Sequence, residues 1–349
     1  MSDFSKYVIS SDTTIREALI RLNSISDDVL TLLVVDKEDH FLGSITDGDI
    51  RRCLINGIKL EDQIINALHR NYFYINDFNL TLKTVENIKN QLIDLVPHLS
   101  DDNKILKVYN FAKLKSLLPI DVVMMAGGRG ERLRPLTDLV PKPLLKIGNK
   151  AIIDYNVEEL LLHGVKTFFI TTNYLSDQLE NHFKVKTKSG IRYQCVKEDK
   201  PLGTIGAIKL IDNFMHEDVL IMNSDLFTNI DYEDFYKTFK DEGADMAVAA
   251  IPYNINIPYA ILDYDGDQIK SFQEKPSYTY YANAGIYLIK KELINKIPID
   301  TFFNTTDLLE VLLIENKKVI KYPIIGYWID IGKHEDFKKA QEFAKHIKS

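Results

Sequence analysis

The sequence predicts an α/β protein in which a smaller α+β region precedes a doubly wound, mostly parallel sheet. Two observations predict it: apolar runs alternate with helical patterns from about residue 120 onward, and the first 115 residues alternate the same patterns on a shorter scale. Alternation of this kind is typical of parallel sheets covered by helices on both faces. With 349 residues and 45% hydrophobic content the chain can form two domains, which we place at 1–115 and 116–349.

The N-terminal region is predicted to begin with a helix that is followed by two strands. Apolar residues recur at helical spacing over residues 14–24, and residues 30–35 form a compact apolar strand. The run 43–52, Gly-Ser-Ile-Thr-Asp-Gly-Asp-Ile-Arg-Arg, predicts a second strand, a turn and the start of a helix. Thr46 and Asp49 then lie at the N-terminus of this predicted helix.

This run resembles the end of a cystathionine-β-synthase (CBS) motif, whose T-x-x-D element corresponds to Thr46 and Asp49. The resemblance implies that both residues contact a bound regulatory nucleotide. A degenerate second copy occupies about 60–115, with Tyr109 and Ala112 in place of Thr and Asp, so we expect it to lack the ribose clamp. The pair is expected to bind one nucleotide or none, and a role in dimerisation or docking stays open. Because CBS pairs associate face to face, we expect a homo-oligomer.

The second region follows Pro119, which predicts a boundary. Ligands of such sheets bind beyond the carboxyl ends of the strands. Gly127 and Asp225 both follow apolar strand patterns, which makes them candidates for a binding site. The alternating patterns predict strands at 121–126, 167–171, 191–195 and 219–223, with helices at 152–163, 177–182 and 204–211.

The first of these strands runs into a glycine-rich loop, Ala126-Gly127-Gly128-Arg129-Gly130-Glu131-Arg132-Leu133-Arg134-Pro135-Leu136-Thr137, and Pro141-Lys142-Pro143 follows. Such a loop can aim several backbone N–H groups at phosphate. It is neither a P-loop nor a continued G-x-G-x-x-G dinucleotide motif. The arrangement resembles the signature of the nucleoside-diphosphate-sugar pyrophosphorylases, or sugar-phosphate nucleotidyltransferases, with Glu131 in place of the usual small hydroxyl residue. The resemblance implies a Rossmann-like fold and assigns Ala126, Gly127, Gly128 and Gly130 to nucleotide binding.

The family reaction joins a sugar 1-phosphate to a nucleoside triphosphate, so two polyanions must approach each other and cations are needed. Arg132 and Lys142 match the family positions that hold the triphosphate. Asp225, after the strand at 219–223, and Asp330, in a W-x-D-I-G segment, match the two carboxylates that bind Mg²⁺, which prefers hard oxygen ligands. A turn or cap residue is the alternative interpretation of Asp330.

Two further segments match the family's sugar pocket. In the F-x-E-K-P element, Lys275 is expected to hold the phosphate of the sugar 1-phosphate and Glu274 a sugar hydroxyl. Asn283 and Gly285 belong to an N-x-G-I-Y segment that lines the same pocket. The resemblance thus assigns a catalytic role to Lys275, as it does to Arg132, Lys142, Asp225 and Asp330.

The expected nucleotide is GTP. Glu198 and Gly203 belong to a segment that resembles the E-x-x-P-L-G-T-A-G element of the nucleotide pocket. A carboxylate can only accept hydrogen bonds, so Glu198 can pair with the N1–H and N2–H groups of guanine but repels the carbonyls of uracil or thymine.

These features together predict a sugar-1-phosphate guanylyltransferase with Mg²⁺ as its cofactor. Tandem CBS motifs before such a core resemble the GDP-glucosamine-forming enzymes of legionaminic acid pathways, which suggests glucosamine 1-phosphate as substrate. One alternative is a mannose-1-phosphate guanylyltransferase or some other nucleotide-sugar pyrophosphorylase. An alternative of a different class is a catalytically inactive protein that senses a nucleotide. The net charge of −7 argues against a nucleic-acid partner, and neither a membrane span nor a signal peptide is evident, so we expect a cytoplasmic protein.

Overall fold

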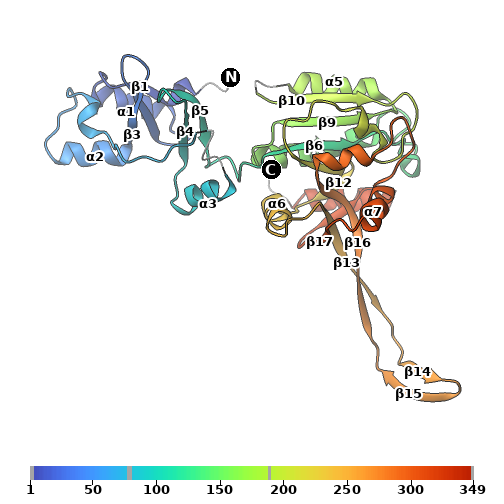
Figure 1. The fold of residues 1–349 in the computed structure, drawn as a ribbon. Helices are drawn as coiled ribbons and strands as arrows, with labels where there is room; N and C mark the ends of the chain where they lie inside the picture. Colours follow the sequence, from blue (N-terminus) through green and yellow to red (C-terminus); the bar gives the residue numbers. More distant parts are fainter. Residues whose placement is uncertain (1–3, 77–80, 188–189, 347–349) are drawn as a thin grey trace. The chain divides into compact units, whose positions relative to one another are not determined.

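The computed structural model describes residues 4–76, 81–187 and 190–346, and the chain divides into two compact units (Figure 1). The first unit comprises residues 1–117 together with 162–164, and the second comprises residues 118–161 and 165–349. Among the described residues, no helix combines the length and the apolar character that crossing a membrane requires.

The first unit has the α+β composition that the sequence predicts. Strand β1 pairs in parallel with β2, and β2 pairs antiparallel with β3, while β4 and β5 form a separate antiparallel pair. Apolar residues of α1 pack on this first sheet, because Ile15, Ala18 and Leu22 share one buried cluster with Leu32 and Leu33. The elements of the unit are β1 (Val8–Ser10), α1 (Ile15–Ser24), β2 (Thr31–Val35), β3 (Phe41–Thr46), α2 (Asp47–Ile55), α3 (Leu82–Asn90), β4 (Leu95–Leu99) and β5 (Ile105–Asn110).

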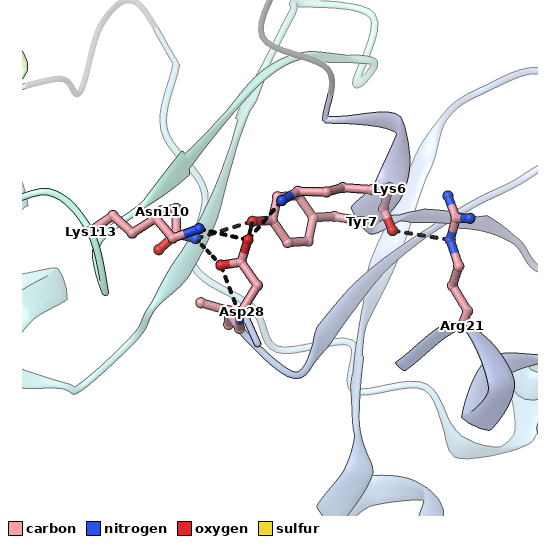
Figure 2. Close-up of polar contacts among 7 residues, drawn as sticks. Lys6, Tyr7, Arg21, Asp28, Asn110 and Lys113 are labelled. Carbon is pink, nitrogen blue, oxygen red and sulfur yellow. Dashed lines mark hydrogen bonds and ion pairs between the residues drawn. The ribbon is translucent and has the colours of Figure 1, made fainter. Parts of the chain in front are cut away.

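A polar network around Asp28 joins the beginning of this unit to its end, near residues 110–113 (Figure 2). One carboxylate oxygen of Asp28 accepts hydrogen bonds from Lys6 at 2.7 Å, from the Tyr7 hydroxyl at 2.7 Å and from Lys113 at 2.8 Å. The other oxygen accepts from the Asn110 amide at 2.8 Å. Burial alone would raise the pKa of Asp28, but the hydrogen bonds from Lys113, Lys6 and Tyr7 outweigh it and hold the pKa well below its ordinary value.

We expect Asp28→Asn to destabilise the first unit by about 2 kcal/mol, because hydrogen bonds to a charged group contribute roughly 1.5–3 kcal/mol. A carboxylate whose pKa is depressed by folding stabilises the folded state above the unfolded pKa, and this contribution is lost as the pH falls. The difference between the wild type and the variant should therefore shrink below about pH 4. Hydrogen exchange of β2 and β3 at several pH values measures this stability difference. Asp27→Asn, at an exposed position, is the control. A pH-independent difference would contradict this explanation.

The second unit contains a seven-stranded sheet in the order β10-β9-β6-β11-β16-β13-β17. All neighbouring pairs are parallel except those of β16, which runs antiparallel to β11 and β13. Its main elements are β6 (Ile120–Met125), α4 (Ile152–Leu162), β9 (Thr167–Thr172), α5 (Ser176–Lys186), β10 (Arg192–Lys197), β11 (Asp218–Asn223), α6 (Tyr232–Asp241), β13 (Met246–Asn256), β16 (Ser277–Lys290), α7 (Thr305–Ile314), β17 (Val319–Pro323) and α8 (His334–Ala344). Short strands complete it: β7 (Lys146–Ile147), β8 (Lys150–Ala151), β12 (Leu226–Thr228), β14 (Ile261–Asp265), β15 (Gln268–Gln273) and β18 (Trp328–Asp330).

Helices lie on both faces of this sheet. Ile221 of β11 belongs to a buried cluster with Leu308 and Leu312 of α7, whereas the next residue, Met222, receives a contact from the Tyr232 hydroxyl of α6 at 3.8 Å. Successive side chains of a strand point to opposite faces, so α7 and α6 cover different sides. The predicted doubly wound, mostly parallel α/β class is therefore confirmed.

One predicted helix is shorter and of another type. Residues 204–211 were expected to form a helix, and the structure instead has a 3₁₀ helix, η5, over Gly206–Leu210. The N–H groups of Ile205 and Gly206 both donate to the carbonyl of Phe303, so this backbone pairs with a distant segment before the helix begins. The segment that precedes η5 is thereby held against Phe303.

Candidate active site

A cavity of about 640 Å³ lies at the carboxyl ends of the parallel strands β6, β9 and β11. This volume falls within the usual range of small-molecule sites, roughly 300–1,000 Å³. The position agrees with the expectation for an open α/β sheet. The cavity is lined by the glycine loop from Ala126 to Arg132 and by Lys142, Glu198, Gly203 and Asp225, together with Met125, Pro143, Thr171, Asn173, Pro201, Thr204, Asn223, Ser224 and Phe302.

The glycine loop is held against the Pro-Lys-Pro segment at Gly130. Gly130 has a φ of 63°, a left-handed conformation that favours glycine. A methyl group built on it would lie 3.0 Å from the Thr137 side chain and 3.1 Å from Cβ of Lys142. The Thr137 hydroxyl donates to the Gly130 carbonyl at 2.9 Å. A side chain at this position would therefore push the loop away from Lys142.

Lys142 and Asp225 line this cavity, and Asp330, which is not among the lining residues, lies beside them although the three are far apart in the sequence. Strand β12 pairs antiparallel with β18 so that Leu226 lies opposite Asp330, which places Asp225 beside it. The Lys142 ammonium forms an ion pair with Asp225 and lies 3.9 Å from Oδ1 of Asp330. Only 13% of the Lys142 side chain and 18% of the Asp225 side chain is exposed, so their charges interact with little screening.

The two carboxylates also influence each other. Burial raises the pKa of Asp330, the negative charge of Asp225 raises it further, and the cations Lys142 and Arg132 oppose the shift. The Arg132 guanidinium lies beside Gly332, where a built methyl group would be 3.3 Å from its Nη2. A site that raises the pKa of a carboxylate in this way favours an additional cation next to it.

The site offers residues that could bind Mg²⁺ together with a substrate. Within the described part of the chain, no group of three or more His, Cys, Asp or Glu residues could hold a metal ion by itself. Mg²⁺ keeps several waters and is usually bound by one or two carboxylates together with substrate phosphates. Asp225 and Asp330 supply two carboxylates at one edge of the cavity, and Lys142 already occupies the space between them as a cation. The donor set therefore suits a magnesium ion that arrives with a phosphate ligand.

Glu198 lies buried against Gly127, at the start of the glycine loop. It follows β10, and its Oε2 accepts a hydrogen bond from the backbone of Leu202 at 3.1 Å. Its Oε1 points toward Gly127, where a built methyl group would be only 2.9 Å away. Burial raises the pKa of Glu198, and the hydrogen bond from Leu202 lowers it in part. An acceptor oxygen is thus directed into the cavity wall next to the loop.

The structure does not bring the expected sugar-binding residues into this cavity. Glu274 and Lys275 lie between β15 and β16 on an extended hairpin, and their side chains are 64% and 68% exposed. Asn283 and Gly285 lie nearer, because the pairing of Ile286 with Met222 places them beside the end of β11. None of these four residues is among those that line the cavity, and their roles stay predictions.

In the first unit, Thr46 and Asp49 engage each other at the start of α2. Asp49 accepts hydrogen bonds from the Thr46 backbone at 2.9 Å and from its hydroxyl at 2.7 Å, while the Thr46 hydroxyl accepts from the Asp49 backbone at 3.2 Å. This is a capping box, which stabilises the helix. Arg52 also contacts Asp49, at 2.5 Å. A nucleotide contact at Asp49 would therefore share the carboxylate with these partners.

Sequence reasoning missed several residues of the cavity, and Asn173 and Ser224 are the most informative. Asn173 follows β9 and donates to the carbonyl of Glu198 at 3.3 Å, which holds the segment after β10 in place. The Ser224 hydroxyl donates to the Met125 carbonyl at 2.6 Å and ties the end of β11 to the end of β6. Ser224 directly follows the predicted strand 219–223, and Asn173 lies two residues after the predicted strand 167–171, so the strand-end rule could have found both.

A mostly parallel sheet with a strand-end cavity, a glycine loop and paired carboxylates is the arrangement of a ligand-binding α/β protein. The chain belongs to the nucleotidyl transferase family, whose model matches residues 121–346, and residues 2–56 match the model of the CBS domain.

Among similar proteins, mannose-1-phosphate guanyltransferase beta-B from Xenopus laevis is 30% identical over 223 residues, and mannose-1-phosphate guanyltransferase from Debaryomyces hansenii is 29% identical over 224 residues. Each match covers 62% of this chain and 62% of the relative, so the chain spans about three fifths of the length of these relatives. The crystal structure of HddC from Yersinia pseudotuberculosis is 28% identical with a TM-score of 0.51 and covers 64% of this chain and 99% of that one.

Proposed function

We propose that the chain is a sugar-1-phosphate guanylyltransferase, which transfers GMP from GTP to a sugar 1-phosphate and releases pyrophosphate. The observation that carries this proposal is the meeting of Lys142, Asp225 and Asp330 beside the glycine loop. That arrangement places a fixed cation and a pair of hard oxygen ligands next to backbone that can approach phosphate closely. The guanyltransferase names of the relatives support the choice of reaction.

In this mechanism the chain positions two anions and neutralises their charge. A phosphate oxygen of the sugar 1-phosphate attacks the α-phosphorus of GTP, the bond to the β-phosphate oxygen breaks, and pyrophosphate leaves with its electron pair. Lys142 and Arg132 contact phosphate oxygens and oppose their repulsion. The glycine loop binds the triphosphate through its N–H groups. A magnesium ion held by Asp225 and Asp330 would supply further positive charge to the phosphate oxygens.

The preference for guanine rests on Glu198. Its buried carboxylate offers acceptor oxygens beside Gly127, and guanine presents two adjacent donors, N1–H and N2–H. Uracil and thymine present carbonyl oxygens in the corresponding region, which the carboxylate repels. Bidentate contacts of this kind discriminate between bases by about 1–3 kcal/mol.

Pyrophosphate release from GTP, UTP, dTTP and ATP with a panel of sugar 1-phosphates tests the proposal. We propose glucosamine 1-phosphate as the sugar substrate, with mannose 1-phosphate as the alternative that the names of the relatives favour. Faster turnover of UTP or dTTP than of GTP would contradict the guanine assignment. No release with any sugar would favour a nucleotide-sensing protein without activity.

We expect Glu198→Gln to lower kcat/KM for GTP by about 10- to 100-fold, which corresponds to the loss of one acceptor in a bidentate contact. Glutamine carries both an acceptor and a donor, so the same variant should use UTP better than the wild type does. Competition between GTP and UTP measures the ratio directly. Asp199→Asn, at the exposed neighbouring position, is the control and should keep the wild-type preference. An unchanged ratio in Glu198→Gln would place the base elsewhere.

A regulatory nucleotide at Thr46 and Asp49 of the first unit is a second part of the proposal. A ligand there can change the rate only if it binds two arrangements of the protein with different affinity. The match of residues 2–56 to the CBS domain supports a binding module at this place.

A further inference from the structure

The second unit carries a long two-stranded arm, which we define as residues 252–282. Strands β13 and β16 pair from Pro252 opposite Tyr281 to Asn256 opposite Ser277, beyond the part of β13 that pairs with β17. The arm ends in the hairpin of β14 and β15 (Figure 1). Nearly all of its residues are exposed, on both faces of the ribbon. An isolated two-stranded ribbon is at best marginally stable in water, so the arm needs another surface to cover it.

The arm is rich in exposed aromatic and aliphatic side chains. Tyr259 is 75% exposed, Tyr264 is 71% exposed and Phe272 is 66% exposed. At roughly 150–250 Å² for each aromatic side chain, the arm exposes on the order of 1,000 Å² of large hydrophobic surface. A stable interface buries roughly 800 Å² on each partner, and exposed apolar patches of this size mark interaction sites. The exposed large hydrophobics of the arm are Tyr253, Ile255, Tyr259, Ile261, Leu262, Tyr264, Ile269, Phe272, Tyr278, Tyr280 and Tyr281.

The side chains that line the cavity carry no net positive charge, although the proposed reactants are anions. The cations that line the cavity, Arg129, Arg132 and Lys142, are matched by the carboxylates Glu131, Glu198 and Asp225. Two reactants that each carry phosphate groups would meet a lining without net positive charge, and Lys142 is already paired with Asp225. A cation from outside this lining would relieve the repulsion between the reactants.

Lys275, at the turn between β15 and β16, is such a cation. Its φ of 44° is an unusual conformation for a lysine, and strain of this kind often marks functional positions. Within the part of the chain that the structure describes, its ammonium forms an ion pair with Glu274 alone, at 4.0 Å, and both side chains are mostly exposed. Lys275 does not line the cavity of its own chain.

We propose that the arm crosses to a second copy of this chain, buries its aromatic side chains there and places Lys275 in the partner's cavity as a cation for the phosphate of the sugar. A reciprocal exchange of two arms closes a symmetric dimer without leaving either arm exposed. The arm carries four acidic and two basic side chains beside its many exposed apolar ones, which suits a self-association driven by apolar burial. The role of Lys275 in this inference rests on the proposed transferase function, whereas the interface does not.

Heterodimers of two inactive variants test the exchange. Lys142→Met damages the cavity and Lys275→Met damages the arm, and each homodimer should lose about 10²-fold in turnover. The two variants carry different affinity tags, so that heterodimers alone can be purified. With exchanged arms, the cavity of the Lys275→Met chain keeps its Lys142 and receives the unsubstituted Lys275 of the other chain, so this one site is wild-type. We expect about half of the wild-type activity per dimer, since one site of two is intact. Heterodimers as inactive as the parent homodimers, beside an active wild type, would overturn the exchange.

A second measurement does not depend on activity. Serine substitutions at Tyr259, Tyr264 and Phe272 should weaken self-association at least tenfold, seen by sedimentation of the full chain. The control replaces Val185, Met215 and Leu313 with serine, because these hydrophobics of similar exposure lie outside the arm, and it should keep the wild-type mass. A wild-type mass for the arm variant would overturn the interface. An inactive wild type with an arm-dependent dimer would instead contradict only the transferase function.

Discussion

Replacement of Lys142 by methionine should lower the turnover of GTP and sugar 1-phosphate by about 10²- to 10³-fold, the usual effect of losing one preorganised charge-stabilising group. Lys142 begins a 3₁₀ turn between Pro141 and Pro143, and its ammonium is held by Asp225 with 13% of the side chain exposed. Its position is therefore fixed before substrate binds, so little entropy is lost in the transition state. Methionine keeps an unbranched apolar stem that is one atom shorter, which largely separates the loss of charge from a loss of packing.

Steady-state rates of pyrophosphate release measure this effect, with kcat and KM determined separately for both substrates. Lys146→Met is the matched control, because Lys146 lies in the same segment with an exposed side chain. We expect kcat to fall in Lys142→Met while circular dichroism and thermal unfolding stay close to the wild type. A fall confined to KM would assign Lys142 to ground-state binding alone and contradict a role in the transition state.

Much of the site could be predicted because it depends on strand ends. The apolar runs before Gly127 and Asp225 predict buried parallel strands, and the structure ends β6 at Met125 and β11 at Asn223. The carboxyl ends of neighbouring parallel strands share one edge of a sheet, so the loop and the carboxylate had to be close. The position of Asp330 beside Asp225 depends instead on the pairing of β12 with β18, which periodicity does not indicate.

The arm could not be predicted from the same signals. Residues 252–256, Pro-Tyr-Asn-Ile-Asn, continue the apolar run of β13 with an alternating pattern, which is typical of a half-buried strand. The structure exposes both faces of this ribbon, because β13 and β16 continue past the edge of their neighbours. A pattern of period two reports which side chains share a face, but not what covers that face. The motif around Lys275 therefore predicts a residue of the sugar pocket, whereas in the structure the Lys275 side chain is exposed.

Asp225→Asn should change catalysis and nucleotide binding in opposite directions. The variant removes one of the two carboxylates offered to Mg²⁺, and the loss of several kcal/mol of charge stabilisation corresponds to a turnover about 10³-fold lower. It also removes the ion-pair partner of Lys142, whose ammonium is then available to the triphosphate. A hydrogen bond to a charged group contributes roughly 1.5–3 kcal/mol, so GTP should bind about tenfold more tightly when metal is absent.

Titration of a fluorescent GTP analogue in EDTA, beside turnover in excess Mg²⁺, separates these effects. A misfolded variant would lose both activities, whereas the charge argument requires one loss and one gain. Asp330→Asn is the matched comparison: its carboxylate lies 3.9 Å from Lys142 and is 42% exposed, so it should lose turnover without the gain in metal-free binding. Adding Lys142→Met to Asp225→Asn should remove the gain, because the freed ammonium is its source. Weaker metal-free binding by Asp225→Asn would contradict the idea that Asp225 competes with the triphosphate for Lys142.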